Sequence, residues 1–102
     1  MPDSPNGGRF YEIHGSATIA EAFRQVQRQA VQENRGQEMV GALRLLRQGL
    51  QRNPLKLGEP LYRLAALQME IRMAAIGPLA VSFGVCEDRP LVFIKAVSLL
   101  SN

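Results

Sequence analysis

The sequence predicts a small α+β protein in which a helical hairpin covers one face of a small antiparallel sheet. Apolar residues recur every three or four positions in the first half of the chain, which indicates helices, and every second position in the second half, which indicates strands. The length of 102 residues fits one domain. We therefore expect a disordered tail at 1–8, rich in Pro, Gly and Asn, and a single domain at 9–102.

A short strand at 9–13 and a first helix near 17–33 are expected to open the domain. Ser16 and Thr18 are both candidate N-caps for this helix, and Thr18 with Glu21 matches the capping-box pattern. The apolar stripe of the helix consists of Ile19, Phe23, Val26 and Ala30.

A second amphipathic helix is expected from about Gln37 to Arg52, and Asn53-Pro54 should end it, because the residue before proline disfavours the α conformation. The connection between the two helices is short, so they should form an antiparallel hairpin. The apolar stripe of this helix consists of Met39, Leu43, Leu46 and Leu50, and it is widened by Ala42 and Leu45.

Alternating residues predict three strands, at 69–73, 79–86 and 91–97, and 61–64 reads as a further short edge strand. The expected order of the main elements is thus β-α-α-β-β-β. In the first of the three strands we expect Met69, Ile71 and Met73 to face the core. The strand at 91–97 is apolar on both faces, so we expect it at the centre of the sheet.

Composition excludes several classes of protein. The sequence has one His and one Cys and shows no paired ligand spacing, so neither a metal nor another cofactor is predicted. No signal peptide and no apolar run long enough to span a bilayer is visible, so we expect a cytoplasmic protein without a membrane contact.

Basic residues suggest a partner-binding surface. The formal net charge is +3, and residues 24–52 contain six Arg against two Glu. Such a run is either a solvated pair of helix faces or a surface that attracts RNA or an acidic peptide. The candidate binding residues are Arg44 and Arg47 on the second helix and Arg63, Arg72 and Lys95 on the sheet.

Local patterns add a family resemblance. The helices end in Arg-Asn-Pro-Leu-Lys-Leu-Gly-Glu-Pro-Leu at 52–61, and Met-Glu-Ile-Arg-Met follows at 69–73. Leu-Ala-Val-Ser-Phe-Gly-Val at 79–85 and Leu-Val-Phe-Ile-Lys-Ala-Val at 91–97 complete the pattern. The chain resembles the RelE/ParE toxin superfamily of bacterial type II toxin–antitoxin systems over roughly residues 9–100. The resemblance implies an antitoxin protein as partner and RNA, the ribosome or another cellular machine as target.

The catalytic pattern of the superfamily's ribonucleases is matched only in part. Those enzymes carry two basic residues that alternate on the strand before a turn glycine, and here the two positions are Glu70 and Arg72. No cation occurs at 78–80, just after Gly77, or at 98–102. The resemblance thus leaves Arg72 as the one catalytic candidate, with no identified group for proton transfer.

The sequence therefore favours a toxin-like protein that acts by binding and is not an enzyme. A non-catalytic protein-interaction module on the same fold is the alternative, and ribosome-dependent cleavage of mRNA is the third reading. Apolar outward positions on the last strands also leave room for a homodimer.

Overall fold

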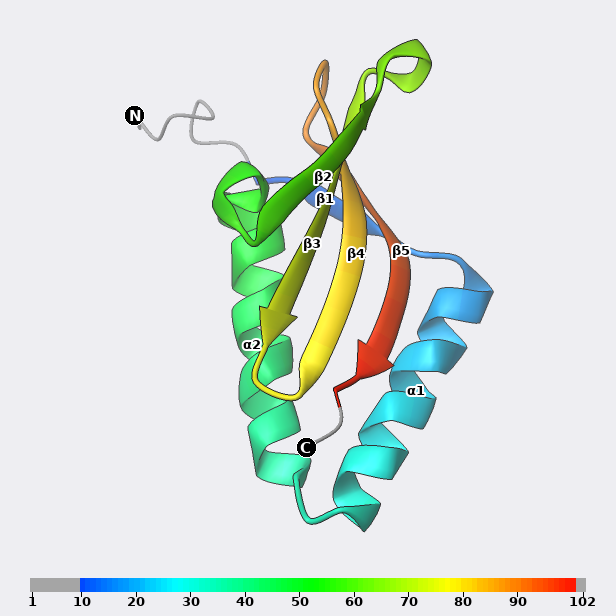
Figure 1. The fold of residues 1–102 in the computed structure, drawn as a ribbon, viewed down its shortest axis with the longest axis vertical. Coiled ribbons are helices and arrows are strands. Elements are labelled where there is room, and N and C mark those ends of the chain that lie inside the picture. Colours follow the sequence, from blue (N-terminus) through cyan, green and yellow to red (C-terminus); the bar gives the residue numbers. More distant parts are fainter. Residues whose placement is uncertain (1–9, 101–102) are drawn as a thin grey trace.

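A computed structural model describes residues 10–100 of the chain, so the tail expected at 1–8 lies outside the described residues. The protein is α+β, with two helices packed against a five-stranded mixed sheet (Figure 1). The main elements are β1 (Glu12–His14), α1 (Ala17–Gln32), α2 (Gly36–Arg52), β2 (Glu59–Leu64), β3 (Met69–Ile76), β4 (Leu79–Cys86) and β5 (Leu91–Leu99). Short 3₁₀ turns at Pro54–Lys56 and Ala65–Leu67 flank β2.

Both predicted helices are confirmed to within about a residue at each end. Of the two candidate N-caps, Ser16 performs the capping: its hydroxyl accepts a hydrogen bond from the Ile19 N–H at 3.2 Å. The capping box expected for Thr18 and Glu21 is wrong. The Glu21 carboxylate instead accepts a hydrogen bond from Arg24 at 2.7 Å, because the two residues are neighbours on the helix surface.

The expectation of an antiparallel sheet is wrong at one edge. The strand order is β1-β5-β4-β3-β2, and β1 runs parallel to β5 while the other pairs are antiparallel. The Glu12 N–H donates to the Pro90 carbonyl at 2.8 Å, so β1 enters the sheet beside the start of β5. Alternation determines which residues share a face but carries no information about the direction of pairing.

The edge strand expected at 61–64 is confirmed and is two residues longer, as β2, Glu59–Leu64, which pairs with β3. The expected position of β5 is corrected. The central strand is β4 and not β5, since β1 covers only the first three residues of β5, Leu91 to Phe93. Beyond Phe93, the edge of β5 that does not pair with β4 has no strand beside it. The helix α1 lies next to β5 there (Figure 1).

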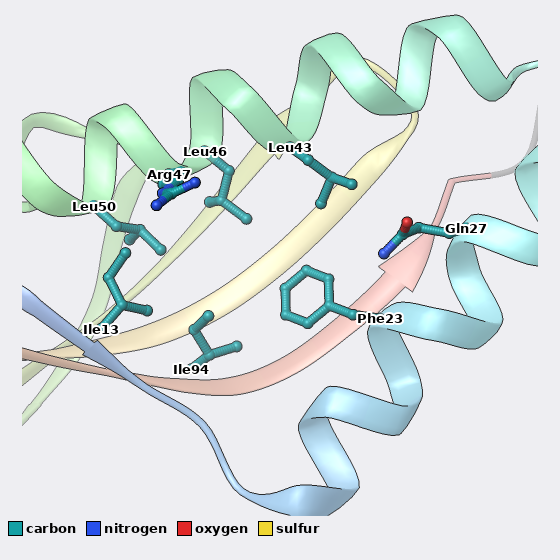
Figure 2. A pocket seen from close by; sticks show the side chains of 8 residues that line it. All are labelled: Ile13, Phe23, Gln27, Leu43, Leu46, Arg47, Leu50 and Ile94. Atoms are coloured by element: carbon teal, nitrogen blue, oxygen red, sulfur yellow. The ribbon is translucent and has the colours of Figure 1, made fainter.

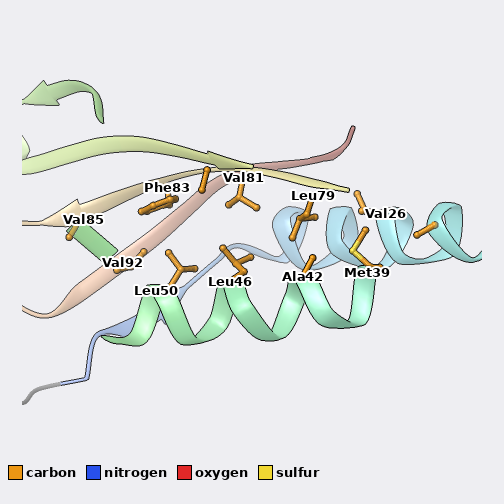
Figure 3. Close-up of a cluster of buried hydrophobic side chains, with 12 residues drawn as sticks. Val26, Met39, Ala42, Leu46, Leu50, Leu79, Val81, Phe83, Val85 and Val92 are labelled. Carbon is orange, nitrogen blue, oxygen red and sulfur yellow. The ribbon is translucent and has the colours of Figure 1, made fainter. Parts of the chain in front are cut away.

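The hydrophobic core fills the space between the helices and one face of the sheet (Figure 3). As predicted, alternate residues of β4 point into it, and the apolar stripes of α1 and α2 face them. The buried members are Val26, Ala30, Met39, Ala42, Leu46, Leu50, Ala74, Leu79, Val81, Phe83, Val85 and Val92.

The faces of β3 are the reverse of the expected ones. Arg72 pairs with Phe83, and Ala74 pairs with Val81, so Arg72 and Ala74 point toward the helices. Met73 lies on the other face, where 46% of its surface is exposed. The expectation that Met69, Ile71 and Met73 form the buried side is therefore wrong for Met73, whereas Ile71 is buried although it points away from the helices.

The N-cap assignment predicts a difference between two hydroxyl residues. Ser16→Ala should lower the free energy of unfolding by about 1 kcal/mol, because the Ile19 N–H loses its acceptor. Thr18→Ala is the matched control and should change it by less than about 0.5 kcal/mol. Urea unfolding measures both, and an equal or larger loss for Thr18→Ala would contradict the assignment.

Candidate functional site

The face of the sheet that points away from the helices, called here the open face, carries one residue of each strand in a single cross-strand row. Pairing places Tyr62 beside Ile71 and Ile71 beside Gly84. Gly84 in turn lies beside Phe93, and Phe93 lies beside His14. Directly paired residues share a face, so the row runs across the whole sheet.

Aromatic rings occupy both ends of this row. The rings of His14 and Phe93 lie 5.4 Å apart between centroids and are tilted by 35°. The His14 Nε2 atom is 3.1 Å from a carboxylate oxygen of Glu12. At the other end Tyr62 is half exposed, at 50%. The row therefore presents flat apolar groups to solvent at two separated points.

The middle of the row is closely packed around Gly84. A Cβ atom on Gly84 would lie 3.0 Å from Cγ of Met69 and 3.1 Å from Cδ1 of Ile71. The Met69 side chain, which is on β3, thus reaches over the backbone of β4. A Cβ at position 84 would require the Met69 and Ile71 side chains to shift, so glycine fits best at the floor of the open face.

The side chain of Lys95, which is on β5, reaches across the open face toward Tyr62 on β2. A bulge in β5 leaves it between Ile94, which pairs with Phe83, and Ala96, the partner of Ser82. Its Nζ atom donates to the Tyr62 hydroxyl at 3.1 Å and lies 5.6 Å from the centre of that ring. Since β4 and β3 lie between β5 and β2, the two side chains meet above the middle strands.

Ile71 is almost fully buried on this otherwise solvent-facing surface, with 1% of its area exposed. Its place in the row is between Tyr62 and Gly84. We infer that the Lys95–Tyr62 bridge and the Met69 side chain cover it. The open face is therefore a mostly apolar surface with one cation held across it.

Arg72, the single catalytic candidate, lies on the other side of the sheet. Its pairing with Phe83 turns it toward the helices, and only 5% of its surface is exposed. Its Nε donates to the Leu57 carbonyl at 3.0 Å, and its Nη2 donates to the Gly58 carbonyl at 3.1 Å. Its Nη1 lies 3.4 Å from a carboxylate oxygen of Glu70. Every nitrogen of the guanidinium thus contacts an acceptor in the protein.

The loop that receives Arg72 is shaped for this contact. Gly58 has a φ of +68°, and a Cβ there would overlap the Met73 carbonyl of β3. This close approach brings the carbonyls of Leu57 and Gly58 to the buried guanidinium. A buried charge must be paired and hydrogen-bonded to be tolerated, and the two carbonyls together with the Glu70 carboxylate provide these contacts. Arg72 therefore has a structural role: it holds the loop between α2 and β2 against β3.

Arg63 is engaged in a two-point ion pair at the end of the sheet. Its Nε and Nη2 donate to the two carboxylate oxygens of Glu87 at 2.6 and 2.7 Å. The hydrogen bond from Arg63 holds the pKa of Glu87 below its ordinary value, and Glu87 raises the pKa of Arg63. The pair ties β2 to the turn between β4 and β5.

The five predicted binding residues thus do not form one site. Lys95 is on the open face, whereas Arg63 pairs with Glu70 on the opposite face of the sheet, where Arg72 is buried. Arg44 and Arg47 are exposed on α2, on the helix side. Sequence reasoning missed the pairing of His14 with Phe93, since only the register of β1 on β5 brings these two rings together.

Other chemistry receives no support from residues 10–100. Burial raises the pKa of the Cys86 thiol, which lowers the fraction of reactive thiolate. No group of three or more His, Cys, Asp or Glu side chains within that range is arranged to hold a metal ion. Neither α1 nor α2 is long and apolar enough to cross a membrane.

Comparison with known proteins finds no matching family model, no matching curated protein and no matching solved structure. The resemblance to the RelE/ParE superfamily therefore depends on the sequence patterns quoted above and stays a prediction.

The structural role of Arg72 predicts a large stability loss. Arg72→Ala would leave the carbonyls of Leu57 and Gly58 without donors and should lower the free energy of unfolding by at least about 2 kcal/mol. Arg44→Ala removes the same charge from an exposed position and should cost less than about 0.5 kcal/mol. Equal stability of the two variants in urea unfolding would refute the structural role.

Proposed function

We propose that this protein is a toxin-like member of the RelE/ParE superfamily that acts by binding a macromolecular target through its open face, without cleaving RNA. One observation carries the proposal. The only basic residue that matches the superfamily's catalytic pattern, Arg72, is buried on the helix side, and its nitrogens contact protein acceptors.

The geometry of the remaining polar groups also disfavours cleavage. Attack by a ribose 2′-hydroxyl needs a group that removes its proton and a group that protonates the leaving oxygen, both near one phosphate. In the described row, His14 and Tyr62 are the residues that can exchange a proton, and they lie at opposite edges of the sheet. Four strand spacings of about 4.8 Å separate their backbones by roughly 19 Å. The row therefore does not place a general base and a general acid on neighbouring strands.

The open face suits a protein surface better than a nucleic-acid backbone. Its exposed apolar residues include Tyr62, Met73 and Phe93, the last of which is 37% exposed. Lys95 is its central cation, and this ammonium is already held by Tyr62. Tight binding of nucleic acid requires several cations along a phosphate chain, whereas an apolar face with a polar edge is typical of protein interfaces.

Two observations support RNA as a second candidate target. Tyr62 and Phe93 stand in the same cross-strand row, and unpaired bases stack on aromatic rings in such positions. Lys95 lies between them and could contact a phosphate after releasing Tyr62. An antitoxin would neutralise either activity by covering the same face. A non-toxic interaction module on this fold is the remaining alternative.

Expression in a bacterial host tests the proposal. The intact protein, induced without an antitoxin, should arrest growth while cellular transcripts stay uncut. Met73→Glu puts a charge on the apolar open face and should restore growth at unchanged protein level. Leu45→Glu makes the same change at an exposed position of α2 and should still arrest growth.

Each outcome of that experiment has a defined meaning. Normal growth with the unmodified protein would reject the toxin and leave the interaction module. Transcripts cut at defined sites would reject action by binding alone. Growth arrest by Met73→Glu equal to that of the unmodified protein would reject the open face as the binding surface.

A further inference from the structure

A pocket opens between the two helices on the side of the molecule opposite to the open face. The helices meet at the turn between Gln32 and Gly36 and diverge toward their other ends (Figure 1). Because they diverge, their side chains do not fill the space above β1 and β5. The resulting interhelical pocket has a volume of about 310 Å³ and is lined by Ile13, Phe23, Gln27, Leu43, Leu46, Arg47, Leu50 and Ile94 (Figure 2).

The lining of this pocket resembles that of a binding site. Six of its eight residues are apolar, and Gln27 and Arg47 supply the polar groups. Figure 2 shows Phe23 and Gln27 reaching from α1 toward the leucines of α2. Sites that bind ligands or anchor side chains are concave and mainly apolar, with few polar groups, and begin at roughly this volume.

Charge around the pocket has one sign. Within residues 10–100, Arg44 and Arg47 form no ion pair or hydrogen bond. The acidic residues of the hairpin are all engaged by other arginines. Glu21 pairs with Arg24 and Arg28, and Glu33 and Glu38 pair with Arg35. The α2 side of the pocket therefore offers unneutralised guanidinium groups to a carboxylate.

The apolar surface continues from the pocket toward the hairpin turn. On α1, Val31 is exposed and lies one turn beyond Gln27, on the same line of the helix surface. On α2, Val40 is exposed and lies one turn before Leu43. The groove from Phe23 to Val31 is eight residues long, or roughly 12 Å at 1.5 Å per residue. This length fits about two turns of a helix better than a compact small molecule.

We infer that the groove between α1 and α2 binds an acidic amphipathic helix of another protein. One bulky apolar side chain of that helix would enter the interhelical pocket, and a carboxylate about one turn away would pair with Arg47. Apolar anchors at helical spacing in a groove, with charges at the rim that select the partner, are a general mode of recognition. This site is independent of the function proposed for the open face, because the two surfaces lie on opposite sides of the sheet.

Selection from a random peptide library tests the inference with a defined probe. Displayed peptides of roughly 15 residues, about four helical turns, are selected on the full chain. Enriched peptides should combine apolar residues at helical spacing with Asp or Glu. Amide resonances of the protein that shift on adding the best synthetic peptide should lie in residues 19–31 and 40–50.

Three variants separate the groove from other surfaces. Arg47→Glu should weaken the selected peptide by at least about tenfold, and Gln27→Trp should block the pocket. Lys56→Glu makes the same charge reversal outside the groove, at an exposed residue, and should bind like the unmodified protein. If Gln27→Trp fails to fold, Arg47→Glu and the resonance map still decide the result.

Several results would overturn the inference. They are the absence of any enriched peptide, enrichment of basic peptides, and resonance shifts confined to the open face. Octanoate serves as the probe for a small anionic amphiphile. If octanoate fills the pocket while no peptide is enriched, the occupant is a small molecule and the proposed helix is rejected.

Discussion

The buried guanidinium of Arg72 is the interaction on which the rest of the structure depends. It donates to the carbonyls of Leu57 and Gly58 and so fixes the loop that leads from α2 into the sheet. It also favours the face of β3 that meets the helices, because Arg72 cannot turn to the other side without losing its contacts with Leu57, Gly58 and Glu70. The same constraint places Met69, Ile71 and Met73 on the open face, which is therefore apolar.

Two surfaces of different character result from this arrangement. The open face is apolar, aromatic at its ends, and crossed by the Lys95–Tyr62 hydrogen bond. The groove between the helices is apolar at its base and positively charged along α2. A two-layer α+β protein buries one face of its sheet and leaves the other available. Here the divergence of the helices adds a pocket on the other side of the sheet, so the two proposed binding surfaces are separate.

The parts of the fold that could be predicted from sequence are those that depend on local periodicity. The helices and β4 follow from spacing alone, as does the burial of alternate β4 residues. The faces of β3 could not be predicted, because Arg72 is buried only through carbonyls 14 and 15 residues away. The cross-strand row that joins Tyr62 to His14 depends on the register of five strands, and alternation gives no register. For the same reason the candidate cations of the sheet, Arg63, Arg72 and Lys95, could not be assigned to separate faces.

The environment of the Arg72 side chain in solution tests the central claim most directly. In a ¹⁵N–¹H correlation spectrum at neutral pH, its Nε–H should give a resolved resonance that exchanges with water more slowly than that of exposed Arg44. Addition of a short single-stranded RNA should leave this resonance unchanged, because Arg72 faces the helices. A rapidly exchanging Arg72 resonance that shifts when RNA is added would show that this residue is available to a phosphate, and would contradict the account.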